Sequence, residues 1–489
     1  MRARSADEGF DPRDARIAVL EAMVTELTGK NAEFEAKNAE LHAITGKLVE
    51  RIEELEEKLG RNSRNSHLPP SSDGPGAAGR NKTKPETKAK RKRGGQKGHR
   101  GAHRLLLPAE AVDEFVELFP PSCAGCGGAL PQTPDTDPRR TQLFELEVGK
   151  RHITEFRRHE VQCPRCGHRS RAAYDPKKIP SSPFGPQLVA RVAMLTGSYH
   201  LSRRQAQRLL REFFGIELSL GALSGMEAKA AAALQSAYAQ ATRAAQDAPI
   251  KHTDATTWAR AGRLMSLWTL ASTSVTVYKI LADGRRETIR SLFGVLKGFL
   301  VSDRASVFGF WKMKLRQICW AHLLRKFVSF SERDGPAGAI GRELLHCTVL
   351  MFQYWHGLRE GVLTREEFIR WMGPLQLQFE ATLARAAAAG IRRLSGSCTD
   401  ILGHRDALWT FVTHEGVEPT NNHAERELRP FVLWRRRCFG SQSDRGERFA
   451  ERVMTVVQSL RKQGRDVLDF LVESVRALAT GAQPPALVA

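Results

Sequence analysis

The hydrophobic pattern of this 489-residue chain changes period at Pro249, and no other feature of the sequence constrains the fold as strongly. Three short runs follow one another, PIKHTDATTW, RLMSLWTLAST and SVTVYKILA. All are rich in β-branched and aromatic residues, as strands are. RRETIRSLFGVLKG then has the spacing of a helix, and FLVSDRAS is a short apolar run that ends in an aspartate. The sequence therefore predicts an antiparallel meander of three strands, followed by a helix and a fourth strand.

Two aspartates belong to the first and the fourth of these predicted strands. Asp254 lies in the first predicted strand, and Asp303 lies at the end of the fourth. The order is that of a ribonuclease-H-like core, in which these two positions are adjacent. Mg²⁺ prefers hard oxygen ligands, so carboxylates from neighbouring strands can share two ions that activate a nucleophile and stabilise the leaving oxygen. We therefore predict that Asp254 and Asp303 hold a pair of Mg²⁺ ions.

A third carboxylate is expected from a later helix, in the segment NNHAERELRPFVLWRRRCFGS. Asn422, Glu425 and Arg429 are spaced i, i+3 and i+7, so they share one helix face. Glu427 points roughly 160° away on a helix of about 3.6 residues per turn, so only one of the two glutamates can face the aspartates. We predict that Glu425 is the ligand, that Arg429 steadies a phosphate and that Asn422 orients the carboxylate or DNA. The alternative is an exposed helix with ordinary salt bridges.

The residues between Asp303 and Glu425 exceed what such a core needs. They begin with QICWAHLLRKF and continue through amphipathic segments to about Leu408, which predicts an all-helical insertion. Cys319 and His322 stand three apart in this stretch. The spacing suits a metal, but without further ligands it is a weak signal. Packing is the simpler interpretation, and the alternative is that His322 reaches the active site or DNA.

The N-terminal segment has apolar residues in steps of three and four from Ile17 to Leu59. One seam position holds Leu20, Leu27, Phe34, Leu41, Leu48 and Leu55. The other holds Ile17, Val24, Asn31, Asn38, Thr45, Ile52 and Leu59. A sustained seam flanked by Glu and Lys predicts a coiled coil, and asparagine inside it favours a parallel homodimer. A self-packed amphipathic helix is the alternative.

A stretch rich in Gly, Pro, Ser, Lys and Arg follows, from GRNSRNSHLPPSSD to RKRGGQKGHRGAHR. It offers almost no apolar residue to a core and should be disordered when free. Its basic residues cluster at Lys88, Lys90, Arg91, Lys92 and Arg93. The segment is either a solvated linker or a tail that contacts DNA phosphates without reading sequence.

Two Cys-x-x-Cys pairs, Cys123 with Cys126 and Cys163 with Cys166, lie within residues 109 to 180. A glycine follows each pair and lets backbone amides approach the sulfurs of a tetrahedral ion. The intervening FELEVGKRHITEFRRHEVQ predicts a hairpin that brings the pairs together, as in a zinc ribbon. Four Cys ligands leave no open coordination position, so we expect a structural Zn²⁺. Buried free thiols or a redox pair are the alternatives.

Residues 186 to 233 have helical periodicity around LSRRQAQRLLREFFGIELSLGALSG. Ser202 can open one helix, Gly215 interrupts it, and Ser219 can cap the next. The pattern is typical of a helix-turn-helix, although any helical hairpin can show it. We expect DNA contacts from the basic residues on or beside the first helix, Arg203, Arg204, Arg208 and Arg211.

Charge and hydropathy narrow the function classes. Lys and Arg number 75 against 54 Asp and Glu, a formal net charge of +21 with a pI near 10.0, which suits a polyanion such as DNA. No run approaches the roughly 18 apolar residues of a membrane span. The start, MRARSADEGFDPRD, lacks the apolar core of a signal peptide. We therefore expect a cytoplasmic protein that joins the nucleoid when bound to DNA and makes no membrane contact.

Taken together, these motifs resemble the transposases of the insertion-sequence-66 family, which are bacterial DDE enzymes. The resemblance covers nearly the whole chain and includes LGRNSRNSHLPPSSD, RKRGGQKGHRG, GIELSLGALS, VSDRASVFGF, ICWAHLLRKF and EPTNNHAERELRPFVLWRRRCFGS. It implies a catalytic triad of Asp254, Asp303 and Glu425, and it matches the family's Cys-Trp-Ala-His signature to residues 319–322. The family often has Asp-Glu-Thr at the first aspartate, whereas residues 254–256 read Asp-Ala-Thr here.

The resemblance implies DNA cleavage at the ends of a mobile element, followed by strand transfer to a target. Water attacks first, and then the freed 3′ hydroxyl. In-line displacement at phosphorus needs positioning and charge neutralisation, which suits two Mg²⁺ ions held by three carboxylates. The resemblance also implies small accessory proteins. The rival functions are a sequence-specific DNA-binding regulator that is not an enzyme, and a nuclease of the same fold that cleaves without joining.

We therefore expect a multidomain α/β protein. Its segments are an N-terminal coiled coil (1–62), a basic linker (63–108), a zinc ribbon (109–180), a helix-turn-helix region (181–245), the first part of a ribonuclease-H-like core (246–310), an all-helical insertion (311–408), and the rest of the core with closing helices (409–489).

Overall fold

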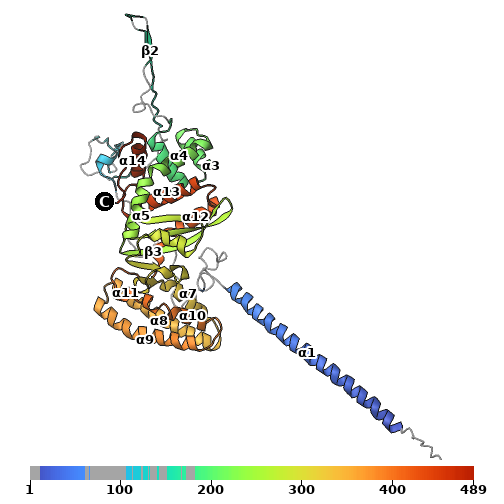
Figure 1. The fold of residues 1–489 in the computed structure, drawn as a ribbon. Helices are drawn as coiled ribbons and strands as arrows, with labels where there is room; N and C mark the ends of the chain where they lie inside the picture. Colours follow the sequence, from blue (N-terminus) through green and yellow to red (C-terminus); the bar gives the residue numbers. More distant parts are fainter. Residues whose placement is uncertain are drawn as a thin grey trace, which may run out of the picture. The chain divides into compact units, whose positions relative to one another are not determined.

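The structure is a computed structural model that describes residues 12–60, 65 and 182–488, and short stretches between 106 and 171 (Figure 1). These stretches are 106–112, 114–119, 121–122, 125–129, 132, 140–142, 151–162, 164–166 and 168–171. The fold is mixed α/β and mainly helical, with one five-stranded sheet. Within the described ranges, no helix is long and apolar enough to cross a membrane.

The chain divides into two compact units. The first comprises Met1–Arg80, Asp247–Asp254 and Arg285–Arg426, and the second comprises Asn81–Gln246, Ala255–Gly284 and Glu427–Ala489. The polypeptide passes from one unit to the other at the last residue of one helix, within one strand and again within a second helix. Each unit is therefore assembled from segments that are distant in sequence.

The N-terminal helix α1 (Pro12–Gly60) is continuous over 49 residues and is drawn in blue in Figure 1. It confirms the helix that the heptad pattern predicts. The seam side chains whose burial is described are exposed, Leu20 at 54% and Phe34 at 63% among them, and Lys30 pairs with Glu26 one turn away. An apolar seam of this kind needs a second helix to bury it, so the coiled coil stays a prediction.

The main sheet has the strand order β5-β4-β3-β6-β7. β3 (Ile250–Arg260), β4 (Arg263–Ala271) and β5 (Thr276–Leu281) follow one another, and β4 pairs antiparallel with β5. After α6 (Arg286–Phe293), the chain forms β6 (Phe299–Ser302), which is parallel to β3. The predicted order of strand, strand, strand, helix and strand is therefore confirmed.

A fifth strand, β7 (Arg316–Ile318), pairs parallel with β6. It lies within residues 311–408 and corrects the expectation that this segment is all helical. The strand has three residues, and all are buried, including the charged Arg316. A run this short with polar residues inside it has neither alternation nor an apolar stretch, so its sequence does not indicate a strand.

Beyond β7 the first unit is helical. Its helices there are α7 (Trp320–Ser331), α8 (Gly335–Arg359), α9 (Arg365–Ala388), α10 (Ser395–Leu402) and α11 (Thr410–Thr413), with the 3-10 turn η7 (Arg405–Ala407), whereas the 3-10 turns η5 (Ser306–Phe310) and η6 (Met313–Leu315) precede β7. Their apolar faces share one core with Val301 of β6 and Ile318 of β7. The expected insertion therefore packs into the same core as the parallel strands.

The second unit is a helical layer around the antiparallel strands. Its helices are α2 (Pro186–Ala193), the π-helical turn η4 (Met194–Ser198), α3 (Arg203–Phe214), α4 (Leu220–Ala233), α5 (Gln235–Asp247), α13 (Asp444–Lys462) and α14 (Val467–Thr480). α12 (Asn422–Cys438) begins in the first unit and ends in the second. Upstream, β1 (Glu160–Gln162) and β2 (Arg169–Arg171) form a short antiparallel hairpin, and η3 (Ala109–Ala111) is a single turn.

Helix α13 covers the edge of the sheet at β5. Three backbone N–H groups of β5 donate to α13 side chains, Thr276 to Ser459, Tyr278 to Thr455 and Ile280 to Glu451, at 3.1, 3.0 and 2.7 Å. The acceptors recur every four residues of helix, about 6 Å, and the donors every two residues of strand, about 6.8 Å, so the two repeats match. The edge is therefore satisfied by side chains and closed to further strands.

Candidate functional site

The register of β3 and β6 relates the two predicted aspartates. His252 of β3 lies opposite Val301 of β6 in a parallel pair. Asp303 directly follows β6, and the same register continued by two residues would set Asp254 beside it. Neighbouring strands lie about 4.8 Å apart, and residues in register on parallel strands point to the same face of the sheet. This register supports the prediction that the two aspartates lie close together where β6 ends.

A buried guanidinium holds the loop that begins at Asp303. Arg316 is 1% exposed and donates from Nη2 to the Asp303 carbonyl oxygen at 3.1 Å and to Ser302 Oγ at 3.2 Å. Burial lowers the pKa of Arg316 to about 10, and the attraction of Asp303 opposes that shift, so the side chain is charged at neutral pH. Asp303 Oδ1 in turn accepts the Ala305 N–H at 3.0 Å. These bonds fix the start of the loop.

Asn421, directly before α12, joins that helix to the strands. It is fully buried, its Nδ2 donates to the Thr253 carbonyl oxygen at 2.7 Å, and its backbone N–H donates to Cys319 Sγ at 3.1 Å. The Asn421 carbonyl accepts the Glu425 N–H at 3.2 Å and so begins the helix. Thr253 precedes Asp254, so these bonds bring the first turn of α12 to the strand that carries the first aspartate.

Two basic side chains of α7 face Glu425. His322 Nδ1 lies 3.8 Å from Glu425 Oε1, and Arg325 Nη2 lies 3.7 Å from Oε2. The three side chains are between 16% and 32% exposed, so water screens these pairs only in part. α7 starts at the carboxyl end of β7, and Cys319 at its start donates its N–H to the Ser302 carbonyl at 2.8 Å. The structure therefore places His322 beside the predicted third carboxylate.

Cys319, His322 and Glu425 also form a group with the spacing of metal ligands. Their ligand atoms all lie within 4.8 Å of one another. Burial raises the pKa of the Cys319 thiol to about 11, so the group is protonated at neutral pH and a metal would have to displace its proton. A mixed S, N and O set suits a softer ion than Mg²⁺. Among the described residues, the structure therefore brings Glu425 within ligand spacing of Cys319 and His322, and a metal set shared with the two aspartates stays a prediction.

Glu427, the other glutamate of the predicted pair, has a different environment. Its Oε1 lies 3.2 Å from Lys462 Nζ, and both side chains are largely buried, at 16% and 12% exposed. Its carbonyl oxygen accepts the hydroxyl of Tyr278. Glu427 therefore pairs with a helix of the second unit, and only Glu425 of the two faces the basic side chains of α7.

Sequence reasoning missed Asn421, Arg325 and Arg316. It selected Asn422 instead, which begins α12 but is exposed, and Arg429 on the same helix is exposed as well. The adjacent Asn421 makes the contacts because it precedes the helix, where a backbone outside helical geometry can turn its amide towards the strands. The dipeptide Asn-Asn was the available signal, but spacing along a helix does not rank a residue that precedes it.

The helix pair α3 and α4 has the boundaries that the sequence predicts. Ser202 caps α3 with a capping box, Gly215 ends it with φ 62°, and Ser219 caps α4. Arg203 pairs with the buried Glu227 of α4 at 2.6 Å, so it holds the two helices together. The other three arginines, Arg204, Arg208 and Arg211, are exposed. A DNA-binding role for this pair stays a prediction.

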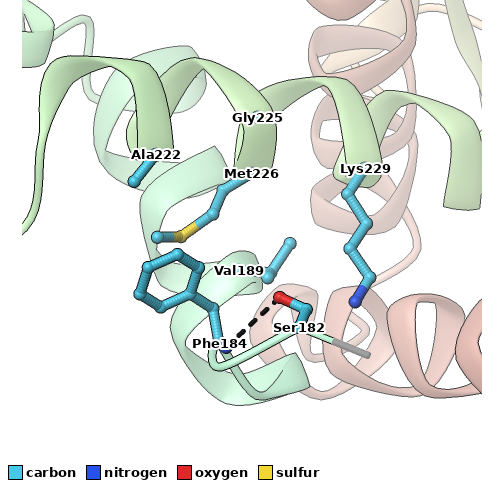
Figure 2. A pocket seen from close by; sticks show the side chains of 7 residues that line it. All are labelled: Ser182, Phe184, Val189, Ala222, Gly225, Met226 and Lys229. Carbon is cyan, nitrogen blue, oxygen red and sulfur yellow. Dashed lines mark hydrogen bonds between the residues drawn. The ribbon is translucent and has the colours of Figure 1, made fainter. Parts of the chain in front are cut away.

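A hollow of about 280 Å³ lies beside α4 (Figure 2). It is lined by Ser182, Phe184, Val189, Ala222, Gly225, Met226 and Lys229. The Phe184 N–H donates to Ser182 Oγ at 3.2 Å, and Lys229 provides the single charge of the lining. With no carboxylate, histidine or thiol among these side chains, the hollow lacks the groups of a catalytic site.

The predicted zinc and linker residues lie mostly outside the described residues. Cys123 and Cys163 are among them, as are Lys88, Lys90, Arg91, Lys92 and Arg93. Cys126 is described in a turn enclosed by the antiparallel bridge of Ser122 and Ala129, and Cys166 in the turn between β1 and β2. The predicted hairpin between the cysteine pairs also lies partly outside the described residues, and its described part forms a strand at β1 alone. The zinc site therefore stays a prediction.

Comparison with known proteins gives two family matches and one relative. A family of unknown function, DUF6444, matches residues 12–105. The uncharacterized protein y4qI of Sinorhizobium fredii (strain NBRC 101917 / NGR234) is similar over 172 residues at 25% identity. The aligned part is 33% of this chain and 31% of y4qI, so the chain spans under a third of that relative. The transposase IS66 family matches residues 181–448, which is more than half of the chain and includes all the residues around Asp254, Asp303 and Glu425 described above. The chain therefore belongs to the IS66 transposase family.

Proposed function

We propose that the protein is a DDE transposase that cleaves the ends of a mobile element and joins them to target DNA. The observation that carries the proposal is the parallel register of β3 and β6, which pairs His252 with Val301 and, continued by two residues, would set Asp254 beside Asp303. The hydrogen bond from Asn421 to Thr253 supports Glu425 as the third member, because it brings the start of α12 to the same strand. Family membership makes DNA the substrate class of the proposal.

The strand order supports a ribonuclease-H-like core for this chemistry. Three consecutive strands, β3, β4 and β5, lie on one side of the sheet order, and the parallel strands β6 and β7 lie on the other side of β3. Under this proposal Asp254, within β3, and Asp303, directly after β6, converge with the start of α12, a helix that follows later in the chain. Under this proposal, residues 311–408 interrupt the core between its second and third carboxylates.

The donor set fits a pair of Mg²⁺ ions. Asp254, Asp303 and Glu425 offer carboxylate oxygens, which Mg²⁺ prefers, and Oε1 of Glu425 is a buried oxygen without a hydrogen bond among the described residues. A buried carboxylate oxygen of this kind is costly unless a cation meets it. When bound, the ions would activate the attacking oxygen and stabilise the leaving one.

The residues of α7 have a separate role in this proposal. Arg325 and His322, both on α7, contact the carboxylate of Glu425. Arg316 of β7 donates to the Asp303 carbonyl and so holds the start of the loop that follows β6. They therefore hold the Glu425 carboxylate and the backbone at Asp303 in place before DNA arrives. Positioning of this kind lowers the barrier, because the ligands need not reorganise during the reaction.

The matched pair Glu425→Gln and Glu427→Gln tests the proposal. The assay incubates full-length protein and Mg²⁺ with a labelled duplex that carries the terminal sequences of its own element, and it separates cut from joined products. Glu425→Gln should lower both products about 100-fold or more, because a ligand charge worth several kcal/mol is lost. Glu427→Gln should cleave within a few-fold of wild type, although losing the pair with Lys462 should cost about 1–3 kcal/mol of stability.

The outcomes separate the rival functions. Cleavage without joining by the wild type would favour a nuclease, and binding without cleavage would favour a regulator. Equal activity in wild type and Glu425→Gln would remove Glu425 from the triad. If Glu427→Gln loses all cleavage while circular dichroism shows a folded protein, the third ligand is Glu427 and the proposal has named the wrong glutamate.

The partners and the remaining domains are part of the same proposal. α1 pairs two protomers, the Cys-x-x-Cys pairs hold a structural Zn²⁺, and α3 with α4 recognises element ends. Small accessory proteins assist the reaction. The heptad seam supports the pairing, and the turns that contain Cys126 and Cys166 support the zinc site.

A further inference from the structure

Phe439 combines exposure with an unusual backbone. It exposes 80% of its surface and has φ 56°, in the left-handed region that bulky residues rarely adopt. Its N–H donates to the Arg435 carbonyl at 2.8 Å, so it stands just after α12, where glycine or asparagine is usual. The ring gains little from burial that would offset this strain. Strain of this kind persists where the surrounding structure imposes it, and it is concentrated at functional sites.

The residues after Phe439 fix the turn to the β3–β4 hairpin. Gly440 has φ 103°, and a Cβ at this position would lie 2.0 Å from the Ala259 carbonyl oxygen. The Ser441 N–H donates to that same carbonyl at 2.8 Å, and the Ser441 carbonyl accepts the Ala261 N–H at 2.9 Å. The turn is therefore bound closely to the hairpin, and Phe439 is held outwards on a rigid support.

Arginines precede the exposed ring. Arg435, Arg436 and Arg437 form the last turn of α12, and the last two are exposed. Arg435 donates to Thr256 Oγ1 at 3.0 Å and to Thr257, so this arginine also ties the end of the helix to β3. Exposed arginines attract a phosphate backbone. A nucleic acid strand drawn to them would bring its bases within reach of the ring.

We propose that Phe439 is a base-stacking site for an unpaired nucleotide of DNA. The inference rests on the proposed function, because it needs a DNA substrate whose strands separate during cleavage. Aromatic rings stack on every base, and apolar side chains enter base steps that are already loosened. The arginines beside the ring favour DNA over an apolar protein partner, as does the net charge of +21.

The test compares full-length wild type with Phe439→Asn and Phe439→Trp. The probes are a forked duplex with 2-aminopurine at its junction and a fully paired duplex of the same sequence. Wild type should bind the fork more tightly and change its fluorescence. Phe439→Asn should bind the fork about five-fold or more weakly without a fluorescence change, and Phe439→Trp should retain both. Trp371→Asn on α9, an aromatic that is 46% exposed, is the control and should match wild type.

The unfolding temperature of Phe439→Asn distinguishes a DNA-binding role of Phe439 from a structural one. Asn tolerates φ 56° better than Phe, so Phe439→Asn should unfold at an equal or higher temperature while losing fork binding. Equal fork binding and fluorescence in wild type and Phe439→Asn would overturn the inference and leave the proposed function standing. A change of oligomeric state with unchanged DNA binding would make the ring a protein contact, and would also overturn the inference. Failure of wild type to bind either probe would overturn the inference and the proposed function together.

Discussion

Replacing Asn421 with alanine tests whether the residue before α12 positions Glu425. The Asn421 side chain is fully buried, and its Nδ2 donates to the Thr253 carbonyl at 2.7 Å. Its backbone bonds, to Cys319 Sγ and from the Glu425 N–H, do not depend on the side chain. The substitution therefore removes one hydrogen bond between the start of the helix and the strand, one residue before Asp254.

The expected loss of stability comes from opposing contributions. Removing the donor of a buried hydrogen bond costs about 1–3 kcal/mol, and the smaller side chain leaves a small void. In the other direction, Oδ1 of Asn421 is buried and makes no hydrogen bond with the described residues, so alanine removes a polar atom that is costly to bury. We expect a net loss of about 1–2 kcal/mol in the free energy of unfolding.

The effect on cleavage should exceed the effect on stability. Glu425 lies one helical turn after Asn421, so a displacement of about 1 Å at the start of α12 reaches its carboxylate and can cost about 100-fold in rate. Asn421→Asp keeps the size of the side chain but directs an oxygen at the Thr253 carbonyl, so it should be at least as damaging. Denaturant unfolding and the labelled-end assay, both on folded protein, measure the two effects.

Glu415→Ala, a change of an exposed side chain in the loop before Asn421, is the matched control and should alter neither measurement. If Asn421→Ala and Asn421→Asp cleave at the wild-type rate, the contact to β3 does not position Glu425 and the argument from this hydrogen bond is refuted. A loss of stability alone, at full activity, would make Asn421 a purely structural residue.

Three further predictions concern the other parts of the chain. Leu27→Asp combined with Leu41→Asp should convert a dimer into a monomer by light scattering, because both charges enter the exposed seam of α1. Cys126→Ala should reduce bound zinc from about one ion per chain to none by atomic spectroscopy, whereas Cys347→Ala, at a buried position in α8, should retain it. Burial, and to a smaller extent two nearby arginines, lowers the pKa of His200 from 6.5 to about 4. The unfolded state therefore takes up the proton first, so stability should be complete above about pH 6.5 and fall as the pH falls towards 4, and His200→Asn should flatten this slope in denaturant titrations.

The features that sequence predicted well are those encoded by local periodicity. The three strands, the helix and the fourth strand after Pro249 follow from runs of β-branched and aromatic residues, and the structure contains all of them. The boundaries of α3 and α4 follow from Ser202, Gly215 and Ser219, because caps are satisfied by the nearest backbone groups. In both cases the interactions that decide the structure lie within a few residues of each other.

Features decided by distant partners could not be predicted in the same way. β7 is a strand because it pairs with β6 and because Ser302 Oγ and the Asp303 carbonyl accept hydrogen bonds from Arg316 Nη2, not because its three residues form a pattern. Arg325 joins the site because α7 starts at the carboxyl end of β7 and so faces the first turn of α12. Neither contact has a signature within its own segment.

The two glutamates of α12 show where periodicity stops and tertiary structure begins. Their separation of about 160° requires that they face different surroundings. The helical pattern alone does not tell which of the two faces the predicted site. Lys462 favours the prediction of Glu425, since the Lys462 ammonium lies 3.2 Å from Glu427 and neutralises that carboxylate within the second unit. Glu425 faces His322 and Arg325 at longer distances, 3.8 and 3.7 Å, and keeps an oxygen that no described donor satisfies. These contacts hold the Glu425 carboxylate in direction without fully neutralising it, which supports its prediction as the metal ligand, and the difference between the two glutamates depends on the partners that the fold supplies to each.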